Sequence, residues 1–385
     1  MKSTVTEAVQ ARSIEEYAKN NDLKGKKVLL RIDVNVSLGN NGVIDKGEDW
    51  RIIKAYRSID FLIGQGAIVV VLSHIGREPK ETLKPVVDYM LRRMPVGFIP
   101  SYEYELILDT VKEMQHGSVL MLENVRQHEG EKENDPSYLM PIIDICDIYV
   151  NDAFSVSHRS HASVDAVTKE LPSFFGIQFV DEVKALSLVL ETKKEVALVL
   201  GGAKFGTKLD LLKRLLPQVS YALIGGALAN VFLKERGFEV GESYVDDSVD
   251  ISSIVNNEKI ILPVDCVDQD GDVISIDEIH PTDMILDIGH ETEQLFETII
   301  AHSGLVLWNG PMGKYEDGYT SGSLAIAQSL AHAQAYTVTG GGDTAAVVLQ
   351  DSNATDIDFI STGGGAMLDF LVEGTINGIE AIVKK

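Results

Sequence analysis

The sequence has few cysteines, no long hydrophobic run and a shortage of basic side chains. Its two cysteines, Cys146 and Cys266, lie far apart, and neither sits in a cluster of the metal-binding type. This argues against a disulfide framework and a zinc site. The longest wholly apolar run, Ala67–Leu72, is far too short to cross a bilayer, so no membrane partner is expected. The first ten residues lack an apolar stretch with a cleavage-type end, so we expect a cytoplasmic protein.

The shortage of positive charge is uneven along the chain. The sequence has 34 basic and 58 acidic side chains and a net charge of −24, which argues against nucleic acid as a partner. Nine of the eleven arginines nevertheless precede residue 176. Because arginine suits bidentate recognition of phosphate and carboxylate, the first half is expected to bind a small anion. No heptad seam is evident.

The periodicity predicts an α/β fold with two domains. A chain of 385 residues exceeds the roughly 250–300 residues at which one core stops growing. Short, continuous apolar runs alternate with helical patterns, which is typical of buried parallel strands. These runs are 27–34, 67–72, 119–122, 145–150, 196–200, 221–224, 259–262, 305–308, 336–338 and 359–360. We predict two doubly wound parallel-sheet (Rossmann-like) domains.

A break in this pattern places the domain boundary. Pro172 and Gly176 interrupt it, and an amphipathic helical pattern follows over 181–191. The predicted organisation is a first domain over 1–176, a hinge and interdomain helix over 177–191, and a second domain over 192–370. The apolar positions of a tail over 371–385 should dock.

Two glycine clusters near the C-terminus predict phosphate binding. Gly340-Gly341-Gly342-Asp343-Thr344-Ala345 and Ser361-Thr362-Gly363-Gly364-Gly365-Ala366 each follow a short β-type run. Consecutive glycines let backbone N–H groups approach phosphates, and a following helix start adds partial positive charge. Asp343 and Thr344 could supply a Mg²⁺ ligand and a hydroxyl contact. A single cluster would more often serve only a turn or a cap, but the recurrence favours a site.

Two nucleotide-binding motifs are excluded. Gly201-x₄-Gly206-Thr207-Lys208 nearly matches the P-loop, but its last two residues are exchanged, so hydroxyl and amine could not reach Mg²⁺ and phosphates as that loop requires. The first strand lacks a following Gly-x-Gly-x-x-Gly, which argues against a nicotinamide-binding domain.

Polar clusters follow nearly every apolar run, and together they resemble the phosphoglycerate kinase family over essentially the full length. The matching segments are Leu30-Arg31-Ile32-Asp33-Val34-Asn35-Val36, Leu72-Ser73-His74-Ile75-Gly76-Arg77, Leu122-Glu123-Asn124-Val125-Arg126, Asn151-Asp152-Ala153-Phe154 with His158-Arg159-Ser160-His161-Ala162-Ser163, Gly201-Gly202-Ala203-Lys204, Trp308-Asn309-Gly310-Pro311-Met312-Gly313, and the two glycine clusters.

The resemblance implies a phosphotransferase with a carboxyl group as acceptor. It implies reversible, Mg²⁺-dependent phosphoryl transfer between ATP and the carboxylate of 3-phosphoglycerate, giving 1,3-bisphosphoglycerate and ADP in glycolysis and gluconeogenesis. It also implies an acid site on the first domain, a nucleotide site on the second, and a tail that returns to the first. A monomer is the expectation for the family. An ionised carboxylate needs no general base, so positioning and charge neutralisation suffice.

The resemblance also implies roles for single residues. Acid binding falls to Asp33, Asn35, Arg51, His74, Arg77, Arg126 and Arg159, with Arg51, Lys204 and Lys208 as the catalytic cations. Nucleotide binding falls to Gly201, Lys204, Lys208, Gly225, Asn309, Glu316, Gly341, Gly342, Asp343 and Thr344. Asp343 is the expected metal ligand, and Gly363, Gly364 and Gly365 are expected to offer backbone N–H groups to the transferring phosphate.

Departures from the family pattern keep two alternatives open. Gln127, Glu129, the Phe205-Gly206 pair and Ser155 differ from the usual residues. The chain could therefore be a binding relative with impaired catalysis, or an acyl-phosphate kinase for another small acid. Because the two ligands are expected on separate domains, transfer should need closure about the connector.

Overall fold

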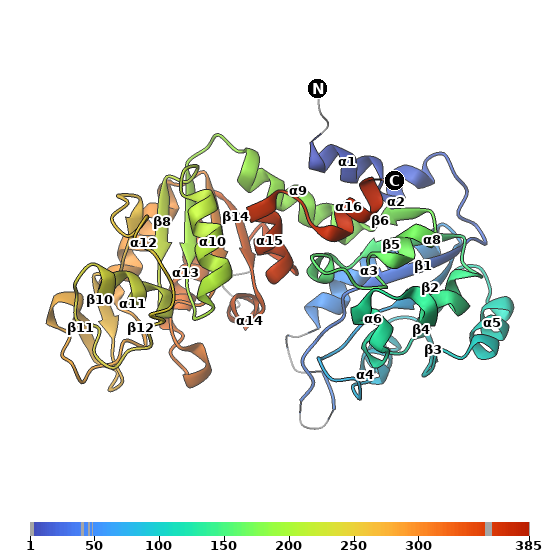
Figure 1. Ribbon diagram of the computed structural model, residues 1–385, viewed down its shortest axis with the longest axis horizontal. Coiled ribbons are helices and arrows are strands. Elements are labelled where there is room, and N and C mark those ends of the chain that lie inside the picture. Colours follow the sequence, from blue (N-terminus) through green and yellow to red (C-terminus); the bar gives the residue numbers. More distant parts are fainter. Residues whose placement is uncertain (1–3, 40–41, 45–46, 48, 351–355, 385) are drawn as a thin grey trace. The chain divides into compact units, whose positions relative to one another are not determined.

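The described residues form two units, each built on its own sheet. The computed structural model describes residues 4–39, 42–44, 47, 49–350 and 356–384. One unit contains the residues up to 184 together with those from 373 onward, and the other contains 185–372 (Figure 1). No helix in these described ranges is long and apolar enough to span a membrane.

The sheet of the first unit is parallel throughout. Its strand order is β3-β4-β2-β1-β5-β6. The strands are β1 Lys27–Ile32, β2 Ile68–Leu72, β3 Gly97–Ile99, β4 Val119–Leu122, β5 Ile148–Asp152 and β6 Ser173–Phe175. In β1, Val28 and Leu30 pack into one core while Leu29 packs into another on the opposite face. Burial on both faces explains why this strand is a continuous apolar run.

Helices cover both faces of that sheet. They are α1 Val5–Ala11, α2 Ile14–Ala18, α3 Trp50–Gly64, α4 Lys84–Met90, α5 Tyr104–Glu113, α6 Glu129–Glu133, α7 Met140–Ile143, α8 Ala166–Glu170 and α16 Asn377–Val383. Helix α16 packs beside α1 and α8, as Figure 1 shows. The Gly378 N–H donates to Ser157 O (2.7 Å), and the Asn377 side chain donates to His158 O (3.1 Å). The predicted return of the tail to the first domain is confirmed.

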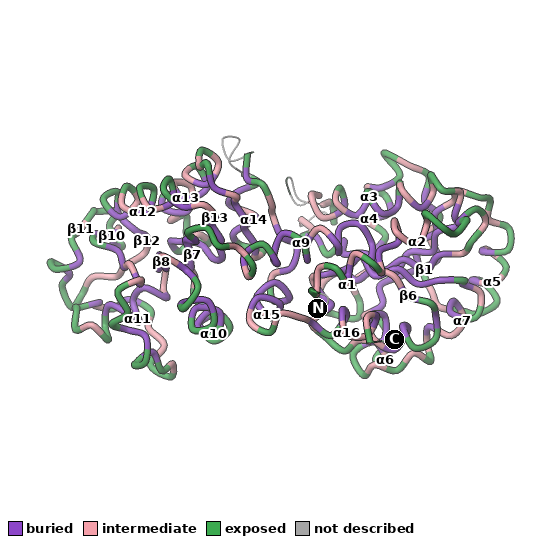
Figure 2. The backbone as a smooth tube through the Cα atoms, turned by 90° about the horizontal axis from the view of Figure 1, so that it is seen from above, coloured by how far each residue is buried: buried purple, intermediate pink, exposed green. Residues whose placement is uncertain are grey.

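The second unit repeats the architecture and adds a small sheet. Its parallel sheet has the order β15-β14-β13-β7-β8-β9, and the central strands β13 and β7 are buried throughout (Figure 2). These strands are β7 Val196–Leu200, β8 Tyr221–Ile224, β9 Ile260–Ile261, β13 Leu305–Asn309, β14 Tyr336–Gly340 and β15 Phe359–Ser361. The helices are α10 Phe205–Leu215, α11 Gly226–Glu235, α12 His290–His302, α13 Ser321–His332, α14 Gly342–Gln350 and α15 Gly365–Glu373. An antiparallel sheet of β10 Asp265–Val267, β11 Val273–Ser275 and β12 Asp287–Ile288 was not predicted.

Helix α9, Ile177–Glu191, leads from the first unit into the second. Its first turn is held by side chains from elsewhere in the first unit. The Ile177 N–H donates to Ser58 Oγ (2.9 Å), and the Phe179 N–H donates to Asp152 Oδ1 (3.0 Å). These bonds satisfy N–H groups that a helix start leaves without partners in the helix. The predicted fold class, two doubly wound α/β domains, is confirmed.

Candidate active site

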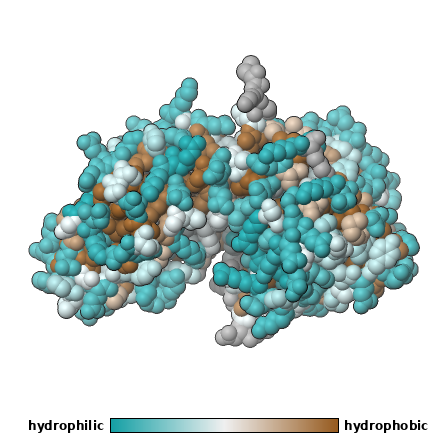
Figure 3. Space-filling model, viewed as in Figure 1, coloured by the Kyte–Doolittle hydropathy of each residue, from teal (hydrophilic) through white to brown (hydrophobic). Residues whose placement is uncertain are grey.

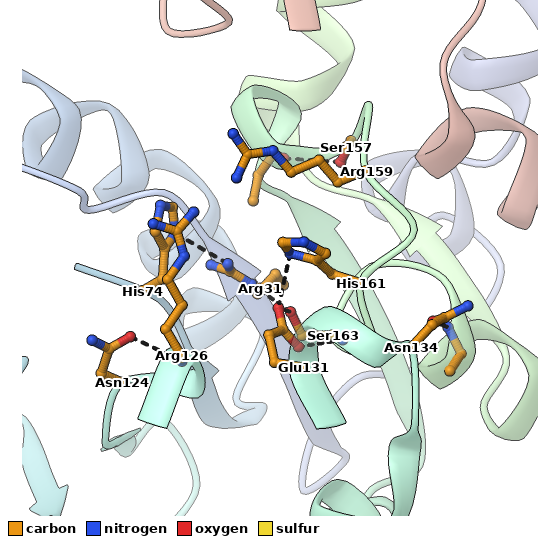
Figure 4. Close-up of polar contacts among 12 residues, drawn as sticks. Arg31, His74, Asn124, Arg126, Glu131, Asn134, Ser157, Arg159, His161 and Ser163 are labelled. Atoms are coloured by element: carbon orange, nitrogen blue, oxygen red, sulfur yellow. Dashed lines mark hydrogen bonds and ion pairs between the residues drawn. The ribbon is translucent and has the colours of Figure 1, made fainter. Parts of the chain in front are cut away.

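One edge of the first sheet gathers polar side chains from several strands. Asp33 follows β1, His74 follows β2, Arg126 follows β4, and Arg159 lies beyond β5. Because the carboxyl ends of parallel strands share one edge, residues far apart in sequence meet there. Figure 4 shows His74, Arg126 and Arg159 in this region.

Asp33 is a carboxylate of this edge that accepts from several donors. It is buried, pairs with the Arg51 guanidinium from the first turn of α3, and accepts from the Asn35 N–H (2.9 Å) and Ser155 Oγ (2.5 Å). Burial alone would raise its pKa, but Arg51, His74, Ser155 and Asn35 together hold the pKa at about 2. Asp33 is therefore an ionised acceptor at neutral pH.

Arg126 is held next to other cations. Its guanidinium donates to Gly76 O, and the Gly76 N–H donates to Asn35 Oδ1 (2.8 Å). Burial, Arg31 and Arg159 lower the pKa of Arg126 to about 10. Such a concentration of positive charge is costly without an anion, so the arrangement suits a bound phosphate or carboxylate. Arg77 and Arg159 are exposed, at the outer side of this group.

Arg31 was missed as a site residue by the sequence reasoning, although it lies within a quoted motif. It sits next to the carboxyl end of β1 and is only 1% exposed, and its Nη2 lies 3.2 Å from His74 Nδ1. Burial and Arg31 lower the pKa of His74 well below its usual value, so the imidazole is neutral. Since arginine only donates, Nδ1 accepts and Nε2 carries the hydrogen. A buried arginine inside an apolar strand was the signal that could have found it.

Two more buried residues were missed beneath the same edge. Glu131, from α6, accepts from the Ser163 N–H (2.9 Å), Ser163 Oγ (2.7 Å) and Tyr138 Oη (2.7 Å). Ser163 Oγ in turn accepts from Arg31 Nε (2.9 Å), and His161 Nδ1 lies 3.6 Å from Glu131 Oε1 (Figure 4). The site therefore rests on a layer of buried charges.

The second unit carries a cavity of about 640 Å³. Four of the predicted nucleotide-binding side chains line it, namely Lys204, Lys208, Glu316 and Asp343. Its other walls are largely apolar and include Leu233, Tyr244, Met284, Leu286 and Met312. Figure 3 shows hydrophobic residues on the face of this unit that carries α11. An apolar slot with charged groups at one end suits a flat base with a phosphate tail.

The two lysines of this cavity differ in environment. Lys208 is buried, and its ammonium donates to Gly201 O. Burial, and to a lesser extent Lys204, lowers the pKa of Lys208 to about 8, although Asp343 acts in the opposite direction. The Lys204 side chain is 85% exposed, with Nζ 3.8 Å from Asp343 Oδ2. Both amines therefore face Asp343.

The first glycine cluster opens helix α14, as its pattern predicts. Gly341 has φ +106°, which favours glycine, and a Cβ there would lie 3.1 Å from Asn309 Nδ2. Asn309 Nδ2 donates to Gly340 O (2.6 Å), and Thr344 Oγ1 accepts from the Gly310 N–H (2.7 Å). Asn309 and Thr344 thus hold the loop together, while Gly342 and Asp343 are exposed.

The remaining predicted glycines border strands and helices of the second unit. Gly201 and Gly225 follow β7 and β8 and are buried, and their neighbours Gly202 and Gly226 line the cavity instead. A Cβ on Gly201 would lie 2.1 Å from Pro311 O. Gly363 and Gly364 lie between β15 and α15, and Gly365 is the first residue of α15.

Comparison with known proteins assigns the family. A family model described as phosphoglycerate kinase matches residues 18–374. The chain belongs to the phosphoglycerate kinase family. It is 37% identical to the phosphoglycerate kinase of Desulfosudis oleivorans, covering 94% of this chain and 97% of the relative. It is 38% identical to that of a Wolbachia strain, covering 95% and 98%.

Solved structures of phosphoglycerate kinases share the fold. The Coxiella burnetii enzyme has a TM-score of 0.79 at 32% identity and covers 95% of this chain and 97% of its own. The Pyrococcus horikoshii enzyme has a TM-score of 0.84 at 27% identity, with 96% and 98% covered. The chain is accordingly a kinase with phosphoglycerate kinase function. Neither the impaired relative nor the kinase for another acid is favoured.

Proposed function

We propose that this member of the phosphoglycerate kinase family transfers a phosphoryl group reversibly between MgATP and the carboxylate of 3-phosphoglycerate, giving 1,3-bisphosphoglycerate and ADP. The observation that carries the proposal is the convergence of Asp33, His74 and Arg126 from three strands on one edge, with Arg51 paired to Asp33. This is a polar, cation-rich site for a small acid with two anionic ends.

In the acid site each group has a distinct task. Asp33, ionised and fixed by three donors, would accept from the hydroxyl of the acid. His74, Arg77, Arg126 and Arg159 would bind the distal phosphate. Arg51 would leave Asp33 and neutralise the charge that develops on the transferring phosphoryl group.

In the nucleotide site the apolar cavity would take the base, and Glu316 the ribose. Lys204 and Lys208 would bind phosphates, together with backbone N–H groups of Gly341, Gly342 and the cluster at 363–365. Phosphate binding would also raise the pKa of Lys208 and keep its ammonium charged.

The donor set fits Mg²⁺ that is bound mainly through the nucleotide. Over the described residues no group of three or more His, Cys, Asp or Glu side chains could hold a metal alone. Asp343, an exposed carboxylate in the first turn of α14, would be the one protein ligand, and phosphates and water would complete the shell. The ion, when bound, neutralises phosphate charge.

Three further features belong to the proposal. We propose a monomeric cytoplasmic enzyme of glycolysis and gluconeogenesis, because the chain is acidic and its sequence shows no heptad seam. We also propose that an acid-binding domain over 1–176 with the tail 371–385 and a nucleotide-binding domain over 192–370 close about residues 177–191, which would exclude water.

The test is ATP consumption with 3-phosphoglycerate, with the acyl phosphate trapped by hydroxylamine. The wild-type protein should give the trapped product, and Arg51→Ala and Lys204→Ala should lose about a hundred-fold or more in kcat. Full activity in either variant would refute its assigned role. No trapped product from the wild type would refute the reaction itself.

A further inference from the structure

Glu131 is a fully buried carboxylate beneath a site built for anions. It is 1% exposed and belongs to α6. A negative charge there repels an anionic ligand, so substrate attraction does not explain it. Its contacts are with Ser163, Tyr138 and His161.

Hydrogen bonds join Glu131, Ser163, Arg31 and His74 into one chain, in which Arg31 donates on both sides. Arg31 Nε–H donates to Ser163 Oγ (2.9 Å), and the Ser163 hydroxyl donates to Glu131 Oε1 (2.7 Å). On its other side, Arg31 Nη2–H donates to His74 Nδ1 (3.2 Å). Because Ser163 spends its only hydrogen on Glu131, its lone pairs face Arg31. The carboxylate of Glu131 therefore orients the Ser163 hydroxyl and, through it, the Arg31 guanidinium.

Electrostatics makes this acceptor necessary. Arg31 is 1% exposed and cannot lose its charge, so it needs a buried countercharge. Burial would raise the pKa of Glu131, yet His161, Arg31, Tyr138 and Ser163 lower it to about 2. Glu131 is thus an ionised partner for Arg31 through Ser163 at any pH at which the enzyme works.

We propose that Glu131 is the positioning residue of the acid site. Through Ser163 it fixes the Arg31 guanidinium, and through Arg31 it holds His74 as the tautomer whose Nε2–H can donate to the anion. This inference rests on the proposed function and deepens it, since it names the group that orders the phosphate-binding face. The same carboxylate also contacts His161, whose Nδ1 lies 3.6 Å from Glu131 Oε1.

The test compares Glu131→Gln with a matched control on the same helix. In Glu131→Gln the neutral amide keeps one oxygen acceptor but places an NH2 donor where the other carboxylate oxygen accepts. It therefore cannot accept from all the donors of Ser163 and Tyr138, and it no longer supplies the countercharge to Arg31. The KM for 3-phosphoglycerate should rise about ten-fold, while the KM for ATP stays unchanged. Glu133→Gln, an exposed change on α6, should leave both constants unchanged.

A nitrogen-15 NMR spectrum of the His74 ring gives a readout that general destabilisation would not produce. Wild-type and Glu133→Gln protein should show one tautomer with the hydrogen on Nε2, and Glu131→Gln should show a mixture of tautomers. Ser163→Ala keeps the Glu131 carboxylate but removes the hydroxyl that links it to Arg31. It should therefore also raise the KM for 3-phosphoglycerate and give a mixture of His74 tautomers. If Glu131→Gln does not fold, Ser163→Ala tests the proposal.

An unchanged His74 tautomer in the folded variant, or a KM for 3-phosphoglycerate within two-fold of wild type, would overturn the proposal. The spectrum needs no turnover. A wild-type protein that fails to phosphorylate 3-phosphoglycerate would therefore refute the proposed function, while the tautomer would still judge the role of Glu131.

Discussion

We predict that enzymatic activity requires Lys208, whereas the stability of the second unit does not. Its ammonium is buried beside the cavity of the second unit and donates to Gly201 O, and burial lowers its pKa from 10.5 to about 8. Replacing it with methionine, which has a similar length and no charge, should stabilise the second unit and abolish activity.

The magnitude follows from the pKa. Each pKa unit corresponds to about 1.4 kcal/mol, so the fall from 10.5 to about 8 is a cost of about 3 kcal/mol for holding the charge in the folded protein. The hydrogen bond to Gly201 O returns about 1 kcal/mol, which methionine forfeits. Lys208→Met should therefore gain about 2 kcal/mol at pH 7.

The stability gained in Lys208→Met should fall as pH rises. A lysine whose pKa is lowered on folding bears its full penalty below the folded pKa of about 8 and loses that penalty as pH rises toward 10.5. The advantage of Lys208→Met should thus be largest at pH 7 and clearly smaller at pH 9.5. For the same reason, the KM of the wild type for ATP should rise above about pH 8 as the free amine deprotonates.

Urea unfolding followed by tryptophan fluorescence measures the stability of the second unit, which contains Lys208. The sequence has two tryptophans, and Trp308 lies buried in β13 of the second unit. A Trp50→Phe background leaves Trp308 as the reporter, so the two units need not unfold together. Lys204→Met is the matched control, because its side chain is 85% exposed and its loss should leave the midpoint unchanged.

The reasoning is refuted if Lys208→Met is no more stable than the background at pH 7, or if its advantage is the same at pH 9.5. Retained activity would separately refute the phosphate-binding role.

Three further predictions concern the groups around these sites. Arg51→Gln should lower kcat about a hundred-fold and raise the pKa of Asp33 above about 2, as carbon-13 NMR of the carboxyl would show; an unchanged pKa would contradict the ion pair. Ser155→Ala should raise the same pKa by a smaller amount, since it removes one donor, and no change would mean that the hydroxyl points elsewhere. Gly310→Ala should cost at least about 1–3 kcal/mol by urea unfolding, because φ is +94° and the new Cβ would lie 2.2 Å from Gly201 O; wild-type stability would show that the loop can yield.

Most of the parallel strands could be predicted because burial on both faces leaves a simple signature. The runs at 67–72, 119–122 and 196–200 coincide with β2, β4 and β7 within a residue. The short strands β3 and β6 gave no such run. In β6, Pro172 and Gly176 flank the strand so closely that the segment reads as a break. In β11, exposed residues alternate with half-buried ones over three positions, which is too short for a period.

The sequence predicted the polar and charged residues that lie at strand ends, but not the charged residues buried beneath that edge of the sheet. Asp33, His74 and Arg126 stand where apolar runs stop, and the first glycine cluster opens a helix as its spacing predicts. Arg31 and Glu131 act from the interior, where a sequence shows a charge but not its partner. Ser163, which joins them, ends a quoted motif, but it is 132 residues from Arg31, so the sequence does not show that the two side chains meet.

The docked C-terminal helix has a consequence for biosynthesis. Asn377 and Gly378 brace the backbone of Ser157 and His158, next to Arg159. A nascent chain on the ribosome would expose residues 1–184 long before it contained this brace. The loop that carries Arg159 would therefore be completed last, and an incomplete polypeptide would fold most of the first unit without the contacts that hold the backbone next to Arg159.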